Sequence, residues 1–92
     1  MYKIMVDCQL NQGASDDSED QPAGFFTVKI ETGNETEARL GAIARTKNQM
    51  IEKGYSLAEV ESSTFSIEEI ELIQNLPDNR DFEQSFIYYP KS

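Results

Sequence analysis

Hydrophobic and polar residues alternate in two segments near the start of the chain. In residues 2–10 the even positions are Tyr, Ile, Val, Cys and Leu, and the odd positions include Lys3, Asp7 and Gln9. Residues 24–32, GFFTVKIET, alternate in the same way. A period of two is typical of strands with one buried face, so both segments are predicted to be strands. The second strand has Phe26, Val28 and Ile30 on one face and Phe25, Thr27, Lys29 and Glu31 on the other.

The connection between these strands is acidic. Residues 11–24 read NQGASDDSEDQPAG, which is long for a hairpin loop and rich in turn-forming residues, so we expect a flexible loop. The carboxylates of Asp16, Asp17, Glu19 and Asp20 raise the alternative of a cation site. An EF-hand loop needs oxygen ligands at positions 1, 3 and 5, Gly at 6 and Glu at 12, and no frame of this segment provides them. A solvated connection is therefore the favoured interpretation.

A helix is predicted to follow, over residues 35–53. Asn34 can cap it, Glu37 has capping-box spacing, and Gly54 suits the left-handed position beyond the last turn. Its apolar residues form one stripe, which is expected to face the sheet. Lys47 falls within this stripe; a methylene stem on the core with the ammonium in water is favoured over a buried pair with a carboxylate. The stripe consists of Leu40, Ile43, Ala44, Met50 and Ile51.

Residues 55–76 allow two interpretations. Ser66 and Glu69 have the spacing of a capping box, which would begin a short helix, but the apolar residues that follow scatter around a helical wheel. A strand with a bulge at Glu68 and Glu69 is preferred, because it keeps four large apolar residues on one face. These are Phe65, Ile67, Ile70 and Leu72. The turn-forming NLPDNRD then leads to a last short strand, FIYYP, which Pro90 ends.

These elements predict the fold class. Their order is strand, strand, helix, strand, strand within a single domain, residues 1–92. We expect an α+β fold in which one long helix packs on one face of a mainly antiparallel sheet of about four strands.

Composition narrows the range of functions. The chain has 17 Asp and Glu against 8 Lys and Arg, a formal net charge of −9. This charge disfavours binding to nucleic acids and to anionic membranes. No run of about 18 apolar residues could span a bilayer, and the N-terminus does not read as a secretory leader, so a cytoplasmic location is expected.

The sequence also lacks the usual catalytic groups. It contains no His, and its single Cys, Cys8, falls on the apolar side of the first strand, where we expect a buried hydrophobe rather than a reactive thiol. It has no glycine-rich nucleotide motif, no zinc-ligand cluster and no nucleophile with an evident base. We therefore expect no catalytic residue, no cofactor and no metal site.

One helix can cover only one face of the sheet, so the second face bears on function. If Ile4, Val6 and Cys8 face the helix, Met5 and Phe25 point the other way, joined by Phe86 and Tyr88 or by Ile87 and Tyr89. An exposed aromatic patch of this kind is typical of a protein interface. Alternatively, residues 11–24 or 76–83 cover it. The predicted interface residues are Met5, Phe25, Tyr88 and Tyr89, with the acidic Glu59, Glu61, Glu69 and Glu71.

Several segments together carry a resemblance. They are a first strand that ends in an acidic residue and Cys, the AGFFTVKIET strand, the acidic-capped helix, the FSIEEIEL segment and the closing FIYYP. In these features the chain resembles a group of short acidic bacterial proteins of unassigned function. The resemblance implies a compact α+β fold and a bacterial cytoplasmic setting, and it supplies no catalytic residues.

These observations lead to three hypotheses about function. The first is a non-enzymatic module that binds a protein through the open sheet face, either itself as a homodimer or another protein. The second is an acidic inhibitor of a basic protein, such as an immunity protein or a DNA mimic. Its acidic residues lie close in sequence: Glu59, Glu61, Glu68, Glu69 and Glu71. The third is a small enzyme or metal-binding protein.

Overall fold

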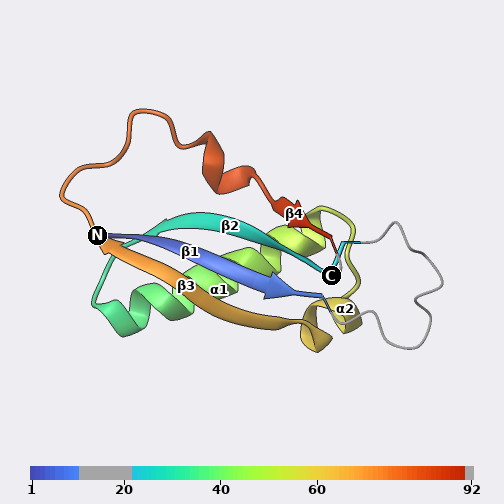
Figure 1. The fold of residues 1–92 in the computed structure, drawn as a ribbon. Coiled ribbons are helices and arrows are strands. Elements are labelled where there is room, and N and C mark those ends of the chain that lie inside the picture. Colours follow the sequence, from blue (N-terminus) through green and yellow to red (C-terminus); the bar gives the residue numbers. More distant parts are fainter. Residues whose placement is uncertain (11–21, 91–92) are drawn as a thin grey trace.

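The computed structural model describes residues 1–10 and 22–90 (Figure 1). Its elements are β1 (Tyr2–Gln9), β2 (Gly24–Glu31), α1 (Glu35–Glu52), α2 (Leu57–Ser62), β3 (Thr64–Leu72), the 3-10 helix η1 (Asp81–Gln84) and β4 (Ile87–Tyr89). The predicted α+β fold is confirmed, with α2 and η1 as additions. The predicted acidic loop and its cation-site alternative fall largely on residues 11–21, outside the described residues.

The four strands form one antiparallel sheet in the order β3-β1-β2-β4. β1 lies inside the sheet and pairs along its whole length with β2 on one side and β3 on the other. Because both neighbours run antiparallel to β1, β2 and β3 run parallel to each other. β4 pairs only with the first three residues of β2. In Figure 1, α1 crosses behind the sheet, and η1 follows the part of the β2 edge that β4 leaves unpaired.

The predicted caps of α1 are confirmed. Asn34 Oδ1 accepts a hydrogen bond from the Glu37 N–H at 2.8 Å, and Glu37 Oε1 accepts one from the Asn34 N–H at 3.2 Å. This reciprocal pair satisfies two backbone donors that the first turn leaves without partners. The helix ends at Glu52, and Gly54 adopts a φ of 108°, a conformation that favours glycine.

The face that α1 turns to the sheet differs from the predicted stripe. Its buried residues are Ala38, Ala42, Thr46 and Met50. Of the predicted stripe only Met50 is fully buried, whereas Leu40 is 65% exposed and Ile51 is 47% exposed. The prediction is wrong because most of the side chains at the contact are small, so that the strands supply most of the large residues of the interface.

The register of β2 also overturns a prediction. Residues directly opposite each other in an antiparallel pair project from the same face. The buried row of β1 lies opposite the more polar row of β2: Cys8 opposite Phe25, Val6 opposite Thr27, and Ile4 opposite Lys29. All three of these β2 residues are at most 1% exposed. Phe25 therefore faces α1, and the prediction that it points to the open face is wrong.

The strand interpretation of the segment from Ser66 is confirmed, together with its bulge. Met5 lies opposite Glu69, and the next residue of β1, Val6, lies opposite Ile67, so Glu68 has no opposite residue in β1. One extra residue in one strand defines a bulge. As predicted, the bulge keeps large apolar residues on the core side: Phe65, Ile67 and Ile70 pack against the core, while Leu72 at the strand end is 69% exposed.

Two apolar clusters fill the space between the sheet and the helices. One includes Ile4 and Val6, and the other includes Phe25 and Met50. Cys8 lies in the second cluster as a fully buried free thiol, as expected, and burial raises its pKa to about 11.

Candidate functional site

The sheet face turned away from α1 carries the second row of each strand. It brings together Lys3, Met5 and Asp7 of β1, Phe26, Val28 and Ile30 of β2, and Glu69 and Glu71 of β3. A shallow hollow of about 190 Å³ lies in this face, lined by Lys3, Met5, Val28, Glu69 and Glu71. The hollow therefore combines apolar side chains from the two inner strands with two carboxylates from the edge strand.

The carboxylates of this hollow form no ion pair among residues 1–10 and 22–90. The ion pairs in those ranges join Arg39 to Glu35, Arg45 to Glu31 and Glu83, and Arg80 to Glu83. Lys3 lines the same hollow, but its Nζ lies 5.7 Å from the centre of the Phe82 ring and makes no ion pair in this part of the chain. Among the described residues, Glu69 and Glu71 therefore form no ion pair, and Lys3, which lies opposite Glu71 in the sheet, is the one cation that lines the hollow with them.

β3 is the last strand on its side of the sheet. No described strand or helix runs alongside its outer edge (Figure 1). Alternate N–H and C=O groups of such a strand point outward, where another chain can pair with them. The bulge at Glu68 and the exposed charges of Glu69 and Glu71 are features that oppose uncontrolled pairing between edge strands.

The predicted interface residues lie in separate regions. Met5, Glu69 and Glu71 line the hollow. Tyr89 belongs to the same face, where its hydroxyl donates to Asp7 Oδ1 at 2.6 Å. Burial, and then the bond to Asp7, raise the pKa of Tyr89. Tyr89 is therefore held against the sheet.

The remaining predicted residues lie elsewhere. Tyr88 sits on the helix side, where its ring contacts Phe25 edge-on at 5.7 Å between centroids, and it is 46% exposed. Glu59 and Glu61 are on α2, and Glu59 accepts a hydrogen bond from the Ser56 hydroxyl at 3.2 Å. The acidic segment 59–71 is thus divided between a helix and the sheet.

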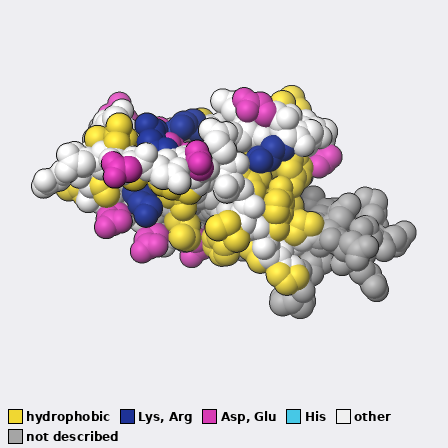
Figure 2. All heavy atoms as spheres, turned by 90° about the horizontal axis from the view of Figure 1, so that it is seen from above, with side chains coloured by type: hydrophobic (Ala, Val, Ile, Leu, Met, Phe, Trp, Pro, Cys, Tyr) yellow, Lys and Arg dark blue, Asp and Glu magenta, His cyan; other side chains and the backbone are white. Residues whose placement is uncertain are grey.

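Hydrophobic side chains are exposed at the end of the molecule near β4. Figure 2 shows hydrophobic side chains gathered toward this end, whereas most of the visible Lys and Arg side chains lie over the other half. Ile87 is 65% exposed, and the Tyr55 hydroxyl donates to the Tyr88 hydroxyl at 3.3 Å. A wide depression of about 270 Å³ lies beside them, lined by Lys53, Gly54, Tyr55, Glu59 and Tyr88.

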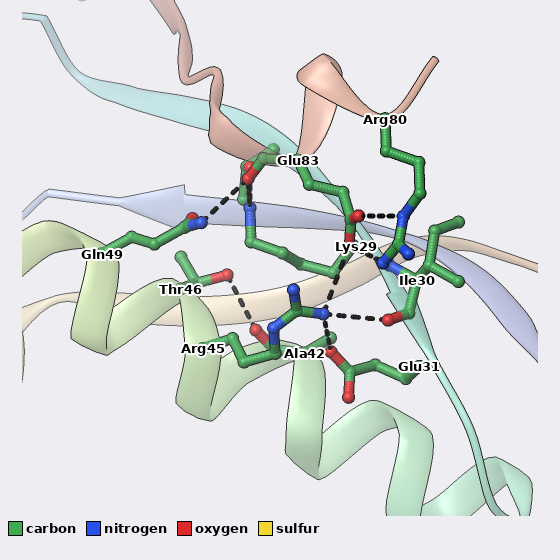
Figure 3. Close-up of polar contacts among 10 residues, drawn as sticks. Lys29, Ile30, Glu31, Ala42, Arg45, Thr46, Gln49, Arg80 and Glu83 are labelled. Atoms are coloured by element: carbon green, nitrogen blue, oxygen red, sulfur yellow. Dashed lines mark hydrogen bonds and ion pairs between the residues drawn. The ribbon is translucent and has the colours of Figure 1, made fainter. Parts of the chain in front are cut away.

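A second group of charged residues lies between α1, β2 and η1, with the buried Lys29 and Glu83 at its centre (Figure 3). The fully buried Lys29 Nζ donates to the Glu83 carbonyl oxygen at 2.7 Å and to Thr27 Oγ1. The Glu83 carboxylate accepts from the Ile30 N–H at 2.9 Å and from Arg80 Nε at 2.6 Å. These bonds attach η1 to the edge of β2.

The ionisation of this group follows from its surroundings. Burial, and then the positive charge of Arg45, lower the pKa of Lys29 to about 8. Burial opposes ionisation of Glu83, but the bonds from Arg80 and the Ile30 N–H and the charge of Arg45 hold its pKa below its usual value. The Lys29 ammonium is fully buried, so it is not exposed to a ligand in solution. Its bond to Glu83 instead holds the C-terminal segment against β2.

The lysine that is buried in the structure is not Lys47, for which the sequence raised that alternative. Lys47 is exposed, with its Nζ 5.4 Å from the centre of the Phe65 ring, so the alternative of a buried pair there is wrong. Lys29 is the buried lysine. The signal that could have found it is its place in a row with Phe25 and Thr27, since a row that contains a large aromatic residue is a candidate for burial.

Residues 1–10 and 22–90 contain no group of three or more His, Cys, Asp or Glu side chains placed to hold a metal ion. Across the same ranges, no helix is long and apolar enough to cross a membrane. Comparisons of the chain with protein-family models, curated proteins and solved structures found no match. The candidate site is therefore defined by its geometry alone: the sheet face turned away from α1, on which Asp7 and Ile30 are buried but Glu69 and Glu71 are exposed, and the adjoining edge of β3; we call this face the open face.

Proposed function

We propose that this protein is a small non-enzymatic module that binds a basic protein through the open face of its sheet and the adjoining β3 strand. The observation that supports the proposal is the separation of charge. All three arginines of the chain are paired with glutamates of β2, α1 or η1. Within the described residues, the carboxylates of β3 have no such partner.

Physical reasons connect this surface with a basic partner. A net charge of −9 accelerates encounter with a cationic protein and makes binding sensitive to salt. The apolar side chains of Met5 and Val28 add surface that a partner can bury. Glu69 and Glu71 at the rim favour a partner whose side chains at that point are Lys or Arg.

The same charges make another protein a better partner than a second copy. Pairing of β3 with β3 would oppose glutamates of the two copies, and like charges directly across a strand pair are destabilising. An acidic inhibitor of a basic protein is one form of the proposed function. The hollow supports an enzymatic role poorly, since its ionisable groups are the two glutamates and Lys3, without a nucleophile and base.

Affinity capture with matched variants tests the proposal. The chain is immobilised, exposed to an extract of its source cells at low salt, and eluted with salt for mass spectrometry. The test variant combines Glu68→Gln, Glu69→Gln and Glu71→Gln. The control variant also loses three negative charges, but from α1, η1 and the segment before η1: Glu52→Gln, Asp78→Asn and Asp81→Asn, which are all exposed.

We expect a basic protein to bind the wild type and the control and to be lost from the test variant. Equal capture by all three chains, or the absence of any basic protein from the eluate, would contradict the proposal.

Self-association is the second candidate, and one observation favours it. Ile87 and Tyr88 of β4 are 65% and 46% exposed. Light scattering after size-exclusion chromatography at low and high salt separates the two candidates. We expect a monomer at both salt concentrations, whereas a salt-resistant dimer would favour an apolar interface between copies.

A further inference from the structure

The outer edge of β3 is divided by its bulge into two straight pieces, residues 64–67 and 69–72. The inner edge of both pieces is paired with β1. The outer edge of both pieces has no described strand beside it (Figure 1). Extended peptides commonly bind proteins by adding a strand to such an edge, where main-chain hydrogen bonds supply affinity and alternate side chains supply specificity.

The hollow lies beside the second piece. Glu69 lies opposite Met5, and Glu71 lies opposite Lys3, so both glutamates project from the open face. Neighbouring strands are about 4.8 Å apart, so an added strand would place every second side chain directly beside these carboxylates. A lysine or arginine there can direct its charged group to the carboxylates, which lie between the added strand and the apolar residues of β1 and β2.

We infer that the partner binds as an extended basic segment, which adds a strand to residues 69–72 of β3 and pairs its Lys or Arg side chains with Glu69 and Glu71. This inference rests on the proposed function, because it states how the basic partner is held. The charges of Glu69 and Glu71 favour a basic segment of another protein over a second copy of this chain. A second copy would bring its own glutamates to the same edge, whereas each basic side chain meets a carboxylate that has no described ion-pair partner.

The test uses a seven-residue peptide of alternating arginine and valine, acetylated and amidated at its ends. Two further versions carry backbone N-methyl groups, one on the arginine amides and the other on the valine amides. In an added strand only one of these two sets of amides faces β3. Binding is measured by fluorescence anisotropy at low salt, and hydrogen exchange of the β3 amides is followed by NMR.

We expect the parent peptide and one methylated version to bind, and the other version to bind at least tenfold more weakly. The parent peptide should slow the exchange of outward-facing amides in residues 69–72 more than in residues 64–67. The Glu69→Gln and Glu71→Gln double variant should lose at least tenfold in affinity. The Glu52→Gln and Asp78→Asn control, which removes two exposed charges elsewhere, should bind as the wild type does.

Other outcomes overturn the inference in distinguishable ways. If both methylated peptides bind as tightly as the parent, the basic segment is held without strand addition, and the proposed function survives. If the parent peptide fails to bind while a basic protein is still captured through the β3 carboxylates, the inference is wrong and the proposed function survives. If neither the peptide nor a basic protein binds, both the inference and the proposed function are wrong.

Discussion

The buried ammonium of Lys29 allows a direct test of the packing between α1, β2 and η1. Lys29→Met keeps an unbranched side chain of similar length and removes the charge. The Glu83 carbonyl keeps its hydrogen bond from Gln49 Nε2 at 2.9 Å, and the Glu83 carboxylate keeps Arg45 and Arg80. The variant leaves no buried charge unpaired, but the buried Thr27 hydroxyl loses its bond from Lys29, so we expect the variant to fold with a stability close to that of the wild type at pH 7.

The magnitude follows from the pKa of Lys29. Burial lowers this pKa from 10.5 to about 8. At 1.36 kcal/mol per pKa unit, holding the protonated lysine costs the folded state about 3 kcal/mol at pH 7. Between pH 8 and 10.5 the unfolded chain binds more protons than the folded chain, so the free energy of unfolding rises with pH. Raising the pH from 7 to 9.5 relieves about 2 kcal/mol of the cost.

Urea denaturation of both chains, followed by circular dichroism at pH 7 and pH 9.5, measures this effect. The difference in free energy of unfolding between the wild type and Lys29→Met should move by about 2 kcal/mol in favour of the wild type at the higher pH. Other titrating groups cancel in this difference. Lys47→Met, which removes an exposed lysine, provides the baseline. A Lys29→Met difference that is the same at both pH values would refute the burial of the ammonium.

Three further predictions test other parts of the fold. Because burial raises the pKa of Cys8 to about 11, a disulfide reagent at pH 8 should label the native thiol at least about a hundredfold more slowly than the urea-unfolded thiol; equal rates would contradict its burial. Asn34→Ala removes the side-chain acceptor that caps α1 and should lower the free energy of unfolding by about 1 kcal/mol in a urea titration, whereas an unchanged midpoint would argue against the cap. Gly24→Ala would place a Cβ against the Cys8 carbonyl oxygen and the Tyr89 ring, so it should destabilise the fold by about 3 kcal/mol in thermal unfolding; a wild-type melting temperature would show that β4 does not pack there.

Only part of the candidate site could be predicted from the sequence. Alternation in the first strand and the preferred bulge in the third predicted that Met5, Glu69 and Glu71 belong to a surface. Their meeting in one hollow depends on which residues lie opposite each other, and a shift of one residue would turn a strand's side chains to the other face. Phe25 shows the consequence, since the register turned it from the predicted interface into the core.

Local sequence determined the four strands and the long helix of this protein, whereas tertiary packing decided which of their faces are buried. The cap at Asn34, the left-handed Gly54 and the period-two strands depend on neighbouring residues, so they can be predicted from the chain alone. Both rows of β2 contain apolar residues, and α1 has small residues on one face and larger ones on another, so local pattern permits more than one arrangement. The register of β1 and β2 determines that the row with Lys29 faces α1. Thr27 and the anchored η1 supply hydrogen-bond partners for Lys29, which allow it to be buried.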